Sequence, residues 1–261
     1  MKKLLVMLLS LILVLSFAAC TPAETPEESS TPAETPAETP AETPADTPAE
    51  TPATFDPAVK SEGVMTHAEF IAAEIDAEVV VEAYVQAHQS WYKDAITVYA
   101  QDLDGGYFFY NMACAEADAA KLVPGTRIKV TGVKAVWEGE IEIVDSTFEI
   151  LEGTWIAEPT DVTALLGTED LIAKQNMLVS FKGLEVVKVE YKGGEPGDDI
   201  YLTLAKDGTE YSFCIERYLT GPETEIYTTA GALKVGATVD VEGFLYWYQG
   251  SNPHLTAITV K

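Results

Sequence analysis

The sequence has few of the residues that usually mark an enzyme or a metalloprotein. Its 261 residues include only three histidines and three cysteines. His67, His88 and His254 are far apart in the chain, and none belongs to a pair with the helical spacing that metal sites use. No serine stands in a nucleophile-elbow pattern, and no glycine-rich loop follows a strand to hold a phosphate. We therefore expect no catalytic residue, no cofactor and no metal ion, and we interpret the chain as a binding protein.

Basic residues are also scarce. The chain has 16 Lys and Arg against 42 Asp and Glu, a formal net charge of −26 at pH 7. Residues 59–261 hold 33 acidic and 14 basic residues, a net charge of −19, so the excess extends through most of the chain. Because nucleic-acid affinity depends largely on basic contacts to phosphate, no nucleic acid is expected among the partners. A solvated acidic surface accounts for the charge, and binding of cations or of a basic partner is the alternative.

Too few cysteines are present for a disulfide framework. Cys20 belongs to an N-terminal motif, which leaves Cys114 and Cys214. These two follow matching segments of two repeats in the chain, so each is predicted to be a small buried residue of its own domain. A disulfide between the domains is the alternative, and it would require two equivalent strands to meet.

The N-terminal residues resemble the signal of a bacterial lipoprotein. A basic start and an apolar run lead to Leu15-Ser16-Phe17-Ala18-Ala19-Cys20, which resembles a lipobox with Phe17 in place of the usual leucine. The resemblance implies a signal peptide over residues 1–19, a lipid on the sulfur of Cys20, and an extracytoplasmic protein anchored to the bacterial cell membrane by that lipid. An ordinary secretory signal and an uncleaved anchor are the alternatives, although the apolar run is short for a spanning helix.

A tether of low complexity follows, so that residues 20–58 comprise Cys20 and a segment made mainly of Thr, Pro, Ala and Glu. Such a segment has almost no large apolar side chain to bury, and nothing offsets the entropy of ordering it. It is predicted to be disordered. Its prolines and like charges favour extended conformers, so at about 3.1 Å per residue it reaches up to roughly 100 Å.

A repeated strand pattern divides the rest of the chain. Residues 124–132, PGTRIKVTG, have a counterpart in residues 235–243, VGATVDVEG. In both copies glycines flank a short segment in which apolar and polar residues alternate, as in a half-buried strand. We therefore predict two related β domains, over residues 59–153 and 154–261.

The order of elements indicates the fold of these domains. In the first, a capping box at Thr66–Glu69 predicts a short helix, and strands are predicted at 79–88, 95–101, 107–110, 124–132 and 140–150, with a helix at 115–122. The second has predicted strands at 177–190, 199–205, 210–216, 237–248 and 254–260, and its connection over 218–233 is interpreted as a loop, with a helix as the alternative. Five strands with a helix between the third and fourth are typical of the OB-fold, a Greek-key barrel. The predicted architecture is all-β with short helices: two tandem five-stranded OB-like barrels after the tether.

Several segments resemble bacterial surface lipoproteins with tandem OB-fold domains. They are Thr66-His67-Ala68-Glu69-Phe70, Gln101-Asp102-Leu103-Asp104-Gly105, Tyr110-Asn111-Met112 and Pro124-Gly125. The likeness covers the whole chain in layout and is firmest in the first domain. It brings no assigned active site with it, and the OB-fold alone does not decide a function.

Aromatic residues are the best candidates for ligand contacts, because their ring faces can stack on sugars or bases. Trp91 and Tyr92 fall in the connection after the first strand, where OB-folds often contact ligands. Alternation in the strand at 107–110 sends Tyr107 to one face and Phe108 and Tyr110 to the other. Trp137 and Trp247 occupy equivalent turns, and the alternative is that they plug the barrel ends. The candidate ligand-binding residues are Trp91, Tyr92, Tyr107, Phe108, Tyr110, Trp137 and Trp247.

Two acidic turns invite a calcium interpretation that their spacing does not support. Asp102 and Asp104 precede two glycines, but the later ligands of an EF-hand are missing. Residues 195–199 form a similar acidic segment, which is predicted to be a solvated loop. Ordinary turn chemistry explains both without a cation.

Together these observations predict a lipid-anchored extracytoplasmic binding protein whose ligand is an extracellular glycan or a surface protein. A structural spacer or assembly module of a surface complex is the alternative, and single-stranded nucleic-acid binding is supported by the fold alone. Under the first hypothesis, replacing Trp91 and Tyr92 with alanine abolishes binding and leaves the melting transition nearly unchanged.

Overall fold

A computed structural model describes residues 55–261, which belong to one compact unit. The predicted signal peptide, the predicted lipidation site Cys20 and most of the predicted tether lie outside the described residues. The described part is mainly β, with eleven strands and a few short helices.

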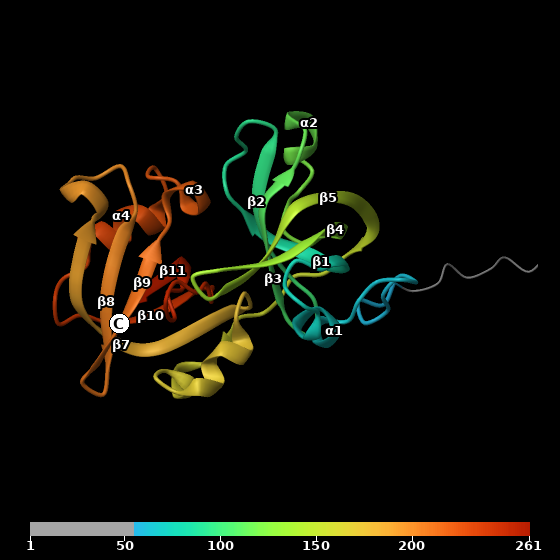
Figure 1. Cartoon of the computed structure of the whole chain (residues 1–261). Coiled ribbons are helices and arrows are strands. Elements are labelled where there is room, and N and C mark those ends of the chain that lie inside the picture. Colours follow the sequence, from blue (N-terminus) through green and yellow to red (C-terminus); the bar gives the residue numbers. More distant parts are fainter. Residues whose placement is uncertain (1–54) are drawn as a thin grey trace, which may run out of the picture. The chain divides into compact units, whose positions relative to one another are not determined.

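The first five strands form a closed barrel with the order β1-β2-β3-β5-β4 (Figure 1). A short helix, α2 (Glu116–Ala119), lies between the third and fourth strands, as the OB interpretation requires. The predicted OB-like barrel is therefore confirmed for this half of the chain. Its strands are β1 (Glu78–His88), β2 (Ala95–Gln101), β3 (Gly106–Ala113), β4 (Thr126–Trp137) and β5 (Glu140–Thr154).

Alternation along the strands builds the core of this barrel. In β3, Tyr107 and Phe109 point inward and are fully buried, as are Ile128 and Val130 of β4. The helix α1 (His67–Ala72) begins at the predicted capping box, in which the Thr66 hydroxyl accepts from the Glu69 backbone N–H and the Glu69 carboxylate accepts from that of Thr66. Phe70 of this helix packs against the same core.

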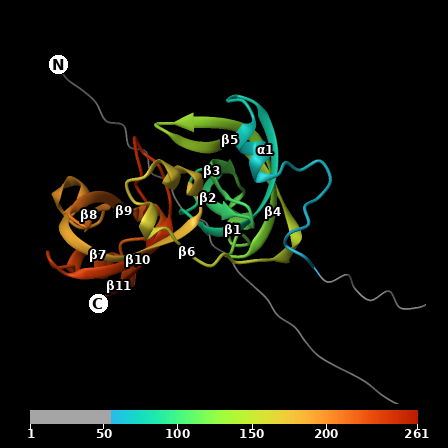
Figure 2. The ribbon, with the colours of Figure 1, turned by 90° about the horizontal axis from the view of Figure 1, so that it is seen from below.

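The remaining strands form a second sheet with the order β10-β11-β9-β8-β7-β6, in which β10 also pairs with β7. Figure 2 shows β7, β10 and β11 side by side in this half. The predicted strands are present near their predicted positions, preceded by the 3-10 helices η1 (Thr163–Leu165) and η2 (Glu169–Lys174), and η3 (Lys192–Gly194) follows β7. The strands are β6 (Thr160–Asp161), β7 (Leu178–Tyr191), β8 (Ile200–Lys206), β9 (Thr209–Ile215), β10 (Thr238–Phe244) and β11 (His254–Val260).

The connection over residues 218–233 is helical, so its interpretation as a loop is wrong. It contains α3 (Arg217–Thr220) and α4 (Glu225–Ala232). The Glu216 carboxylate caps α3, and the Thr224 hydroxyl caps α4. Three apolar residues at i, i+3 and i+6 give α4 one apolar face, which packs on the core of the second sheet: Tyr227, Ala230 and Leu233.

The outer face of β2 and β3 is covered by residues of the second half. Tyr99 and Phe108 are opposite each other in the two strands and are almost fully buried. They pack against Phe244 and Tyr246 in a group that we call the interface cluster: Tyr99, Phe108, Phe244 and Tyr246. The rings of Tyr99 and Phe244 stack with centroids 4.7 Å apart. Burial of each large ring contributes on the order of 2 kcal/mol, so this contact is a substantial part of the core.

A buried hydrogen bond joins the interface cluster to β11. The Tyr99 hydroxyl and His254 Nδ1 are 2.7 Å apart, and both side chains are buried. Burial lowers the pKa of His254 to about 3. The imidazole is therefore neutral at ordinary pH, and its Nδ1 can accept a hydrogen bond from the Tyr99 hydroxyl.

A second polar junction connects the start of β5 to the second half. Glu140 is fully buried, and its Oε2 accepts from the Trp247 backbone N–H at 2.8 Å and from Gln175 Nε2 at 3.2 Å. Within residues 55–261, Glu140 Oε1 and Asn176 Oδ1 have no hydrogen-bond partner, and Asn176 Nδ2 donates to the Ile141 carbonyl at 3.0 Å. No Lys or Arg pairs with Glu140 among the described residues, and burial raises its pKa to about 8. A protonated, neutral carboxyl group costs less to bury without a cation than a charged carboxylate does.

Glu140 is expected to make the protein less stable as the pH rises. Its folded pKa of about 8 lies above the ordinary glutamate value of 4.5, so its contribution to stability is present in full below about pH 4.5 and is lost towards pH 8. The loss is at most roughly 5 kcal/mol over this window. Glu140→Gln keeps the shape and adds an N–H donor, so we expect it to be more stable than the parent at pH 8, by about 3 kcal/mol, in urea unfolding measured from pH 4.5 to 8.5.

Glu149→Gln is the matched control, because Glu149 is an exposed carboxylate on the same strand. It should reproduce the pH dependence of the parent. Parallel stability profiles for the parent and Glu140→Gln would refute the role given to Glu140.

Candidate binding groove

The second half carries a groove on the outer side of β8 and β9. In β9, Phe213 points into the core, so Ser212 and Cys214 face outward, and Tyr201 of β8 lies opposite Cys214. The connection between β10 and β11 borders this face and, together with Trp137 of β4, encloses a hollow of about 630 Å³, which we call the outer hollow. Its aromatic lining residues are Trp137, Tyr201, Tyr246 and Tyr248.

Two exposed rings lie at the rim of the outer hollow. Trp137 and Tyr248 are 51% and 45% exposed, and their ring centroids are 5.2 Å apart. Gln249 fixes the two turns that carry them, since its backbone N–H donates to the Glu138 carbonyl at 2.7 Å and its side chain to the Glu138 carboxylate at 2.9 Å. Gly139 in this turn has φ +97°, and a Cβ there would come within 2.8 Å of Trp247 Cδ1. Glycine thus permits the close approach of the two connections.

The polar groups of the outer hollow are hydrogen-bond partners rather than reactive groups. The Asp199 carboxylate accepts from Lys192 Nζ at 3.0 Å and from the Arg217 backbone N–H at 3.1 Å. The Glu216 carboxylate accepts from two N–H groups of α3, and burial raises its pKa. Burial also raises the pKa of the Cys214 thiol, which remains protonated and is a poor nucleophile. This arrangement suits binding through hydrogen bonds.

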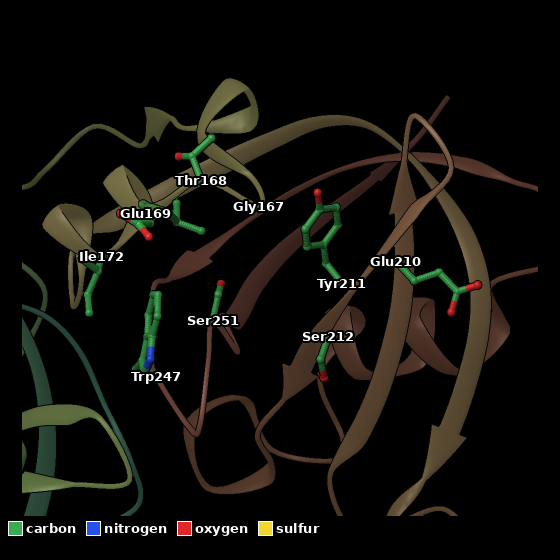
Figure 3. A pocket seen from close by; sticks show the side chains of 10 residues that line it. Gly167, Thr168, Glu169, Ile172, Glu210, Tyr211, Ser212, Trp247 and Ser251 are labelled. Carbon is green, nitrogen blue, oxygen red and sulfur yellow. The ribbon is translucent and has the colours of Figure 1, made fainter.

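A second hollow of about 580 Å³, the end hollow, adjoins the outer hollow at Ser212 and Ser251. Figure 3 shows Trp247 and Ile172 on one side of it and Tyr211 on the other, with the segment from Gly167 to Thr168 above. Glu169 and Glu210 also line this hollow, and neither has an ion-pair partner among the described residues. The outer hollow and the end hollow together form what we call the groove.

Among the predicted contact residues, Trp137 and Trp247 are brought together at the groove. The alternative in which both plug barrel ends is wrong for Trp137, whose ring is half exposed. Trp247 does pack against the core of the second sheet, while one side of it lines the end hollow. These two residues reach one site because Glu140, next to the turn after Trp137, binds the Trp247 backbone.

The predicted contacts from β3 are mostly inside the protein, which corrects Tyr107 and Phe108 as ligand-binding candidates. Tyr107 lies in the barrel core, and its hydroxyl donates to Asp102 Oδ2 at 2.8 Å. Phe108 does point to the outer face, but the interface cluster covers it. Tyr110 is 47% exposed and stacks beside Phe108, outside the groove lining. Alternation correctly predicts that Tyr107 and Phe108 point to opposite faces of β3, but a tertiary contact covers the outer face at Phe108.

Trp91 has a structural role, whereas Tyr92 is a surface residue. Trp91 Nε1 donates to the Cys114 carbonyl at 2.8 Å, and its ring packs against the first core. Tyr92 is 66% exposed, with Lys93 Nζ 4.7 Å from its ring centroid. The neighbouring Ser90 N–H donates to the Tyr218 carbonyl of the second half at 2.8 Å. These contacts predict that replacing Trp91 lowers stability, in contrast to the expectation from the sequence that both residues can be replaced without affecting melting.

Sequence reasoning missed several groove residues, of which the clearest are Tyr201, Tyr248, Gln249 and Asn252. One signal could have indicated two of them: Tyr246-Trp247-Tyr248-Gln249 puts three aromatic residues in a row at the end of the strand predicted over 237–248. Tyr201 carries no such signal, because alternation alone does not say which outer face stays open.

The acidic turns and the remaining cysteines have ordinary structural roles. Asp102 Oδ1 accepts from the N–H groups of Asp104 and Gly105, each at 2.7 Å, and the other oxygen binds Lys60 and Tyr107. Within residues 55–261 no group of three or more His, Cys, Asp or Glu side chains is placed to hold a metal ion. Cys114 and Cys214 are free and buried, which confirms the prediction made for them.

Comparisons with known proteins bear on the fold. No protein-family model matches the chain, and no curated protein matches its sequence. Among solved structures, the asparaginyl-tRNA synthetase of Pyrococcus horikoshii with asparaginyl-adenylate matches at 19% identity and a TM-score of 0.27, over 32% of this chain and 19% of that chain. This chain thus spans about a fifth of the synthetase. The p204 HINb domain matches at 11% identity and a TM-score of 0.34, over 72% of this chain and all of that domain.

The prediction that no nucleic acid is expected among the partners is wrong as an exclusion. A murine DNA-binding protein bound with double-stranded DNA matches at 10% identity and a TM-score of 0.36, over 69% of this chain and 94% of that chain. The p202 HIN1 domain, solved with 12-mer double-stranded DNA, matches at 10% identity and a TM-score of 0.35, over 79% of this chain and 100% of that chain. Net charge averages over a whole surface and describes no single face, so it did not justify the exclusion.

Helices within residues 55–261 are all too short or too polar to cross a membrane.

Trp91→Ala and Tyr92→Ala are expected to differ in stability. Trp91→Ala removes a hydrogen bond and ring packing on the core, at a cost of about 2–4 kcal/mol. Tyr92→Ala removes an exposed ring and should stay within about 0.5 kcal/mol of the parent. Denaturant unfolding of the two variants measures both values, and equal stabilities would contradict the roles described for these residues.

Proposed function

We propose that this chain is a lipid-anchored extracytoplasmic binding protein that holds an extracellular glycan in the groove. The observation that carries the proposal is the pair of exposed rings, Trp137 and Tyr248, at the rim of a hollow whose other lining groups are hydrogen-bonding side chains. Sugar rings present apolar C–H faces and a belt of hydroxyls, so aromatic faces beside amides and carboxylates match their chemistry.

The position of the groove in the fold supports the same function. The pairings β7-β8-β9-β11-β10, with β10 returning to β7, repeat the order of the first barrel, and we interpret the second half as a second OB-like barrel. In OB-folds, ligands bind on the face of the second and third strands and beside the connection between the last two. Here those elements are β8, β9 and the β10–β11 connection, which are the elements that build the groove.

The polar chemistry of the groove supports binding rather than catalysis. Its carboxylates are engaged by backbone groups or lie at the rim, and its thiol is protonated. A protein that only retains a surface polymer needs no nucleophile and no general base, whereas an enzyme that cleaves it needs at least a positioned acid.

Alanine substitutions at the rim test the binding site. Trp137→Ala and Tyr248→Ala should each weaken binding of a glycan by about tenfold, because each removes a stacking surface worth about 1–2 kcal/mol. Tyr92→Ala is the matched control, since it removes an exposed aromatic ring that lies outside the groove. A glycan array followed by titration calorimetry with residues 55–261 measures the affinities.

Three outcomes of this experiment are informative. Loss of a glycan signal in both rim variants but not in Tyr92→Ala supports the proposal. Equal binding by all variants removes the groove as the site. A blank array rejects glycan binding, and duplex DNA and a cell-surface protein extract, assayed in parallel, then identify which other class of partner the chain retains.

The lipid anchor is tested separately through Cys20. The intact protein should partition into the detergent phase of cell extracts, whereas Cys20→Ser should be found in the aqueous phase or remain unprocessed, because it lacks the sulfur that carries the lipid. Mass spectrometry of the N-terminal peptide checks the modification. Equal partitioning of the two proteins would rule the anchor out.

A further inference from the structure

We infer that the groove selects an uncharged oligosaccharide long enough to occupy both hollows, and that it rejects acidic glycans. This inference rests on the proposed function, because it names the class of glycan that the same site takes. It is carried by the charges that line the groove and by the continuity of the outer hollow with the end hollow.

The charged side chains that line the groove are all acidic. Asp199 and Glu216 line the outer hollow, and Glu169 and Glu210 line the end hollow. None of the described residues that line either hollow is Lys or Arg. A uronate or phosphate group in the groove would meet these carboxylates with no Lys or Arg in the lining, and the repulsion between like charges is strongest beside the buried Asp199 and Glu216.

The nearest cation does not change this conclusion. Lys192 Nζ lies 3.0 Å from Asp199 Oδ2 and 4.0 Å from Asp198 Oδ1, so two carboxylates already surround it. Arg217 lies over the ring of Tyr218, 5.1 Å from its centroid, and its side chain is not part of the groove lining.

The two hollows place aromatic surfaces at separate positions along one path. Trp137 and Tyr248 stand at the outer hollow, and Trp247 stands at the end hollow. Both hollows are lined by Ser212 and Ser251, so they adjoin at these two residues, whose hydroxyls can hydrogen-bond to a sugar that extends from one hollow to the other. A single sugar unit can use only one of these surfaces, whereas an oligomer can use both.

The test compares neutral hexose oligomers of one to six units with oligouronates of the same lengths. Binding to residues 55–261 is followed by tryptophan fluorescence at low and at physiological salt. We expect affinity for neutral oligomers to rise at least tenfold from one unit to six and to change little with salt. At low salt, oligouronates should bind at least tenfold more weakly than neutral oligomers of the same length. This difference in affinity should become smaller at physiological salt, because salt screens the carboxylates.

Charge-reversal variants locate the discrimination. Glu169→Lys and Glu210→Lys should each reduce the difference in affinity between neutral and acidic oligomers by several-fold. Glu158→Lys, which makes the same change at an exposed residue outside the groove, should leave this difference unchanged. Equal effects of all three variants would show that net charge, and not the groove, sets the preference, which would overturn the inference.

The failure of this inference can be distinguished from failure of the proposed function. Oligouronates that bind as tightly as neutral oligomers, or a monosaccharide that binds as tightly as a hexamer, would overturn the inference and leave glycan binding intact. No detectable binding of any oligomer, neutral or acidic, would overturn both the proposed function and this inference.

Discussion

Burial of the aromatic face on β2 and β3 is the constraint on which the arrangement of the binding site depends. Tyr99 and Phe108 point away from the core of their own barrel, and two large rings on one strand pair cannot remain in water without cost. The second half covers them with Phe244 and Tyr246. This face of the first barrel is therefore covered, whereas the outer face of β8 and β9 borders the groove.

The same contact brings the parts of the groove together. Phe244 and Tyr246 belong to the segment that continues into Trp247 and Tyr248, so docking of that segment on the first barrel also positions the rim. Glu140 then fixes the Trp247 backbone from the first barrel, and the turn that follows Trp137 lies directly before it. The buried Glu140 carboxyl group is therefore part of the contact that positions Trp247 at the end hollow.

Local patterns were enough to predict most strands, the α1 capping box and the buried free cysteines. Each of these depends on neighbours in the sequence: alternation for β2 and β9, a hydroxyl and a carboxylate three residues apart for α1. The helix α4 was missed because its apolar face, formed by Tyr227, Ala230 and Leu233, is interrupted by threonines and a glycine that are typical of loops. Packing on the second sheet outweighs these weak propensities.

The sequence by itself determined the strand order, the inner and outer face of each strand, the acidic charge and the motif that predicts a lipid anchor, because all of these follow from residue type and short-range spacing. Only the tertiary structure decided which aromatic residues are available to a ligand. Tyr99 of β2 and Tyr201 of β8 are both outward residues of their sheets, yet Tyr99 is covered and Tyr201 is 37% exposed. The difference arises from contacts between residues more than a hundred positions apart, such as Tyr99 with His254 and Glu140 with Trp247, and no local pattern records them.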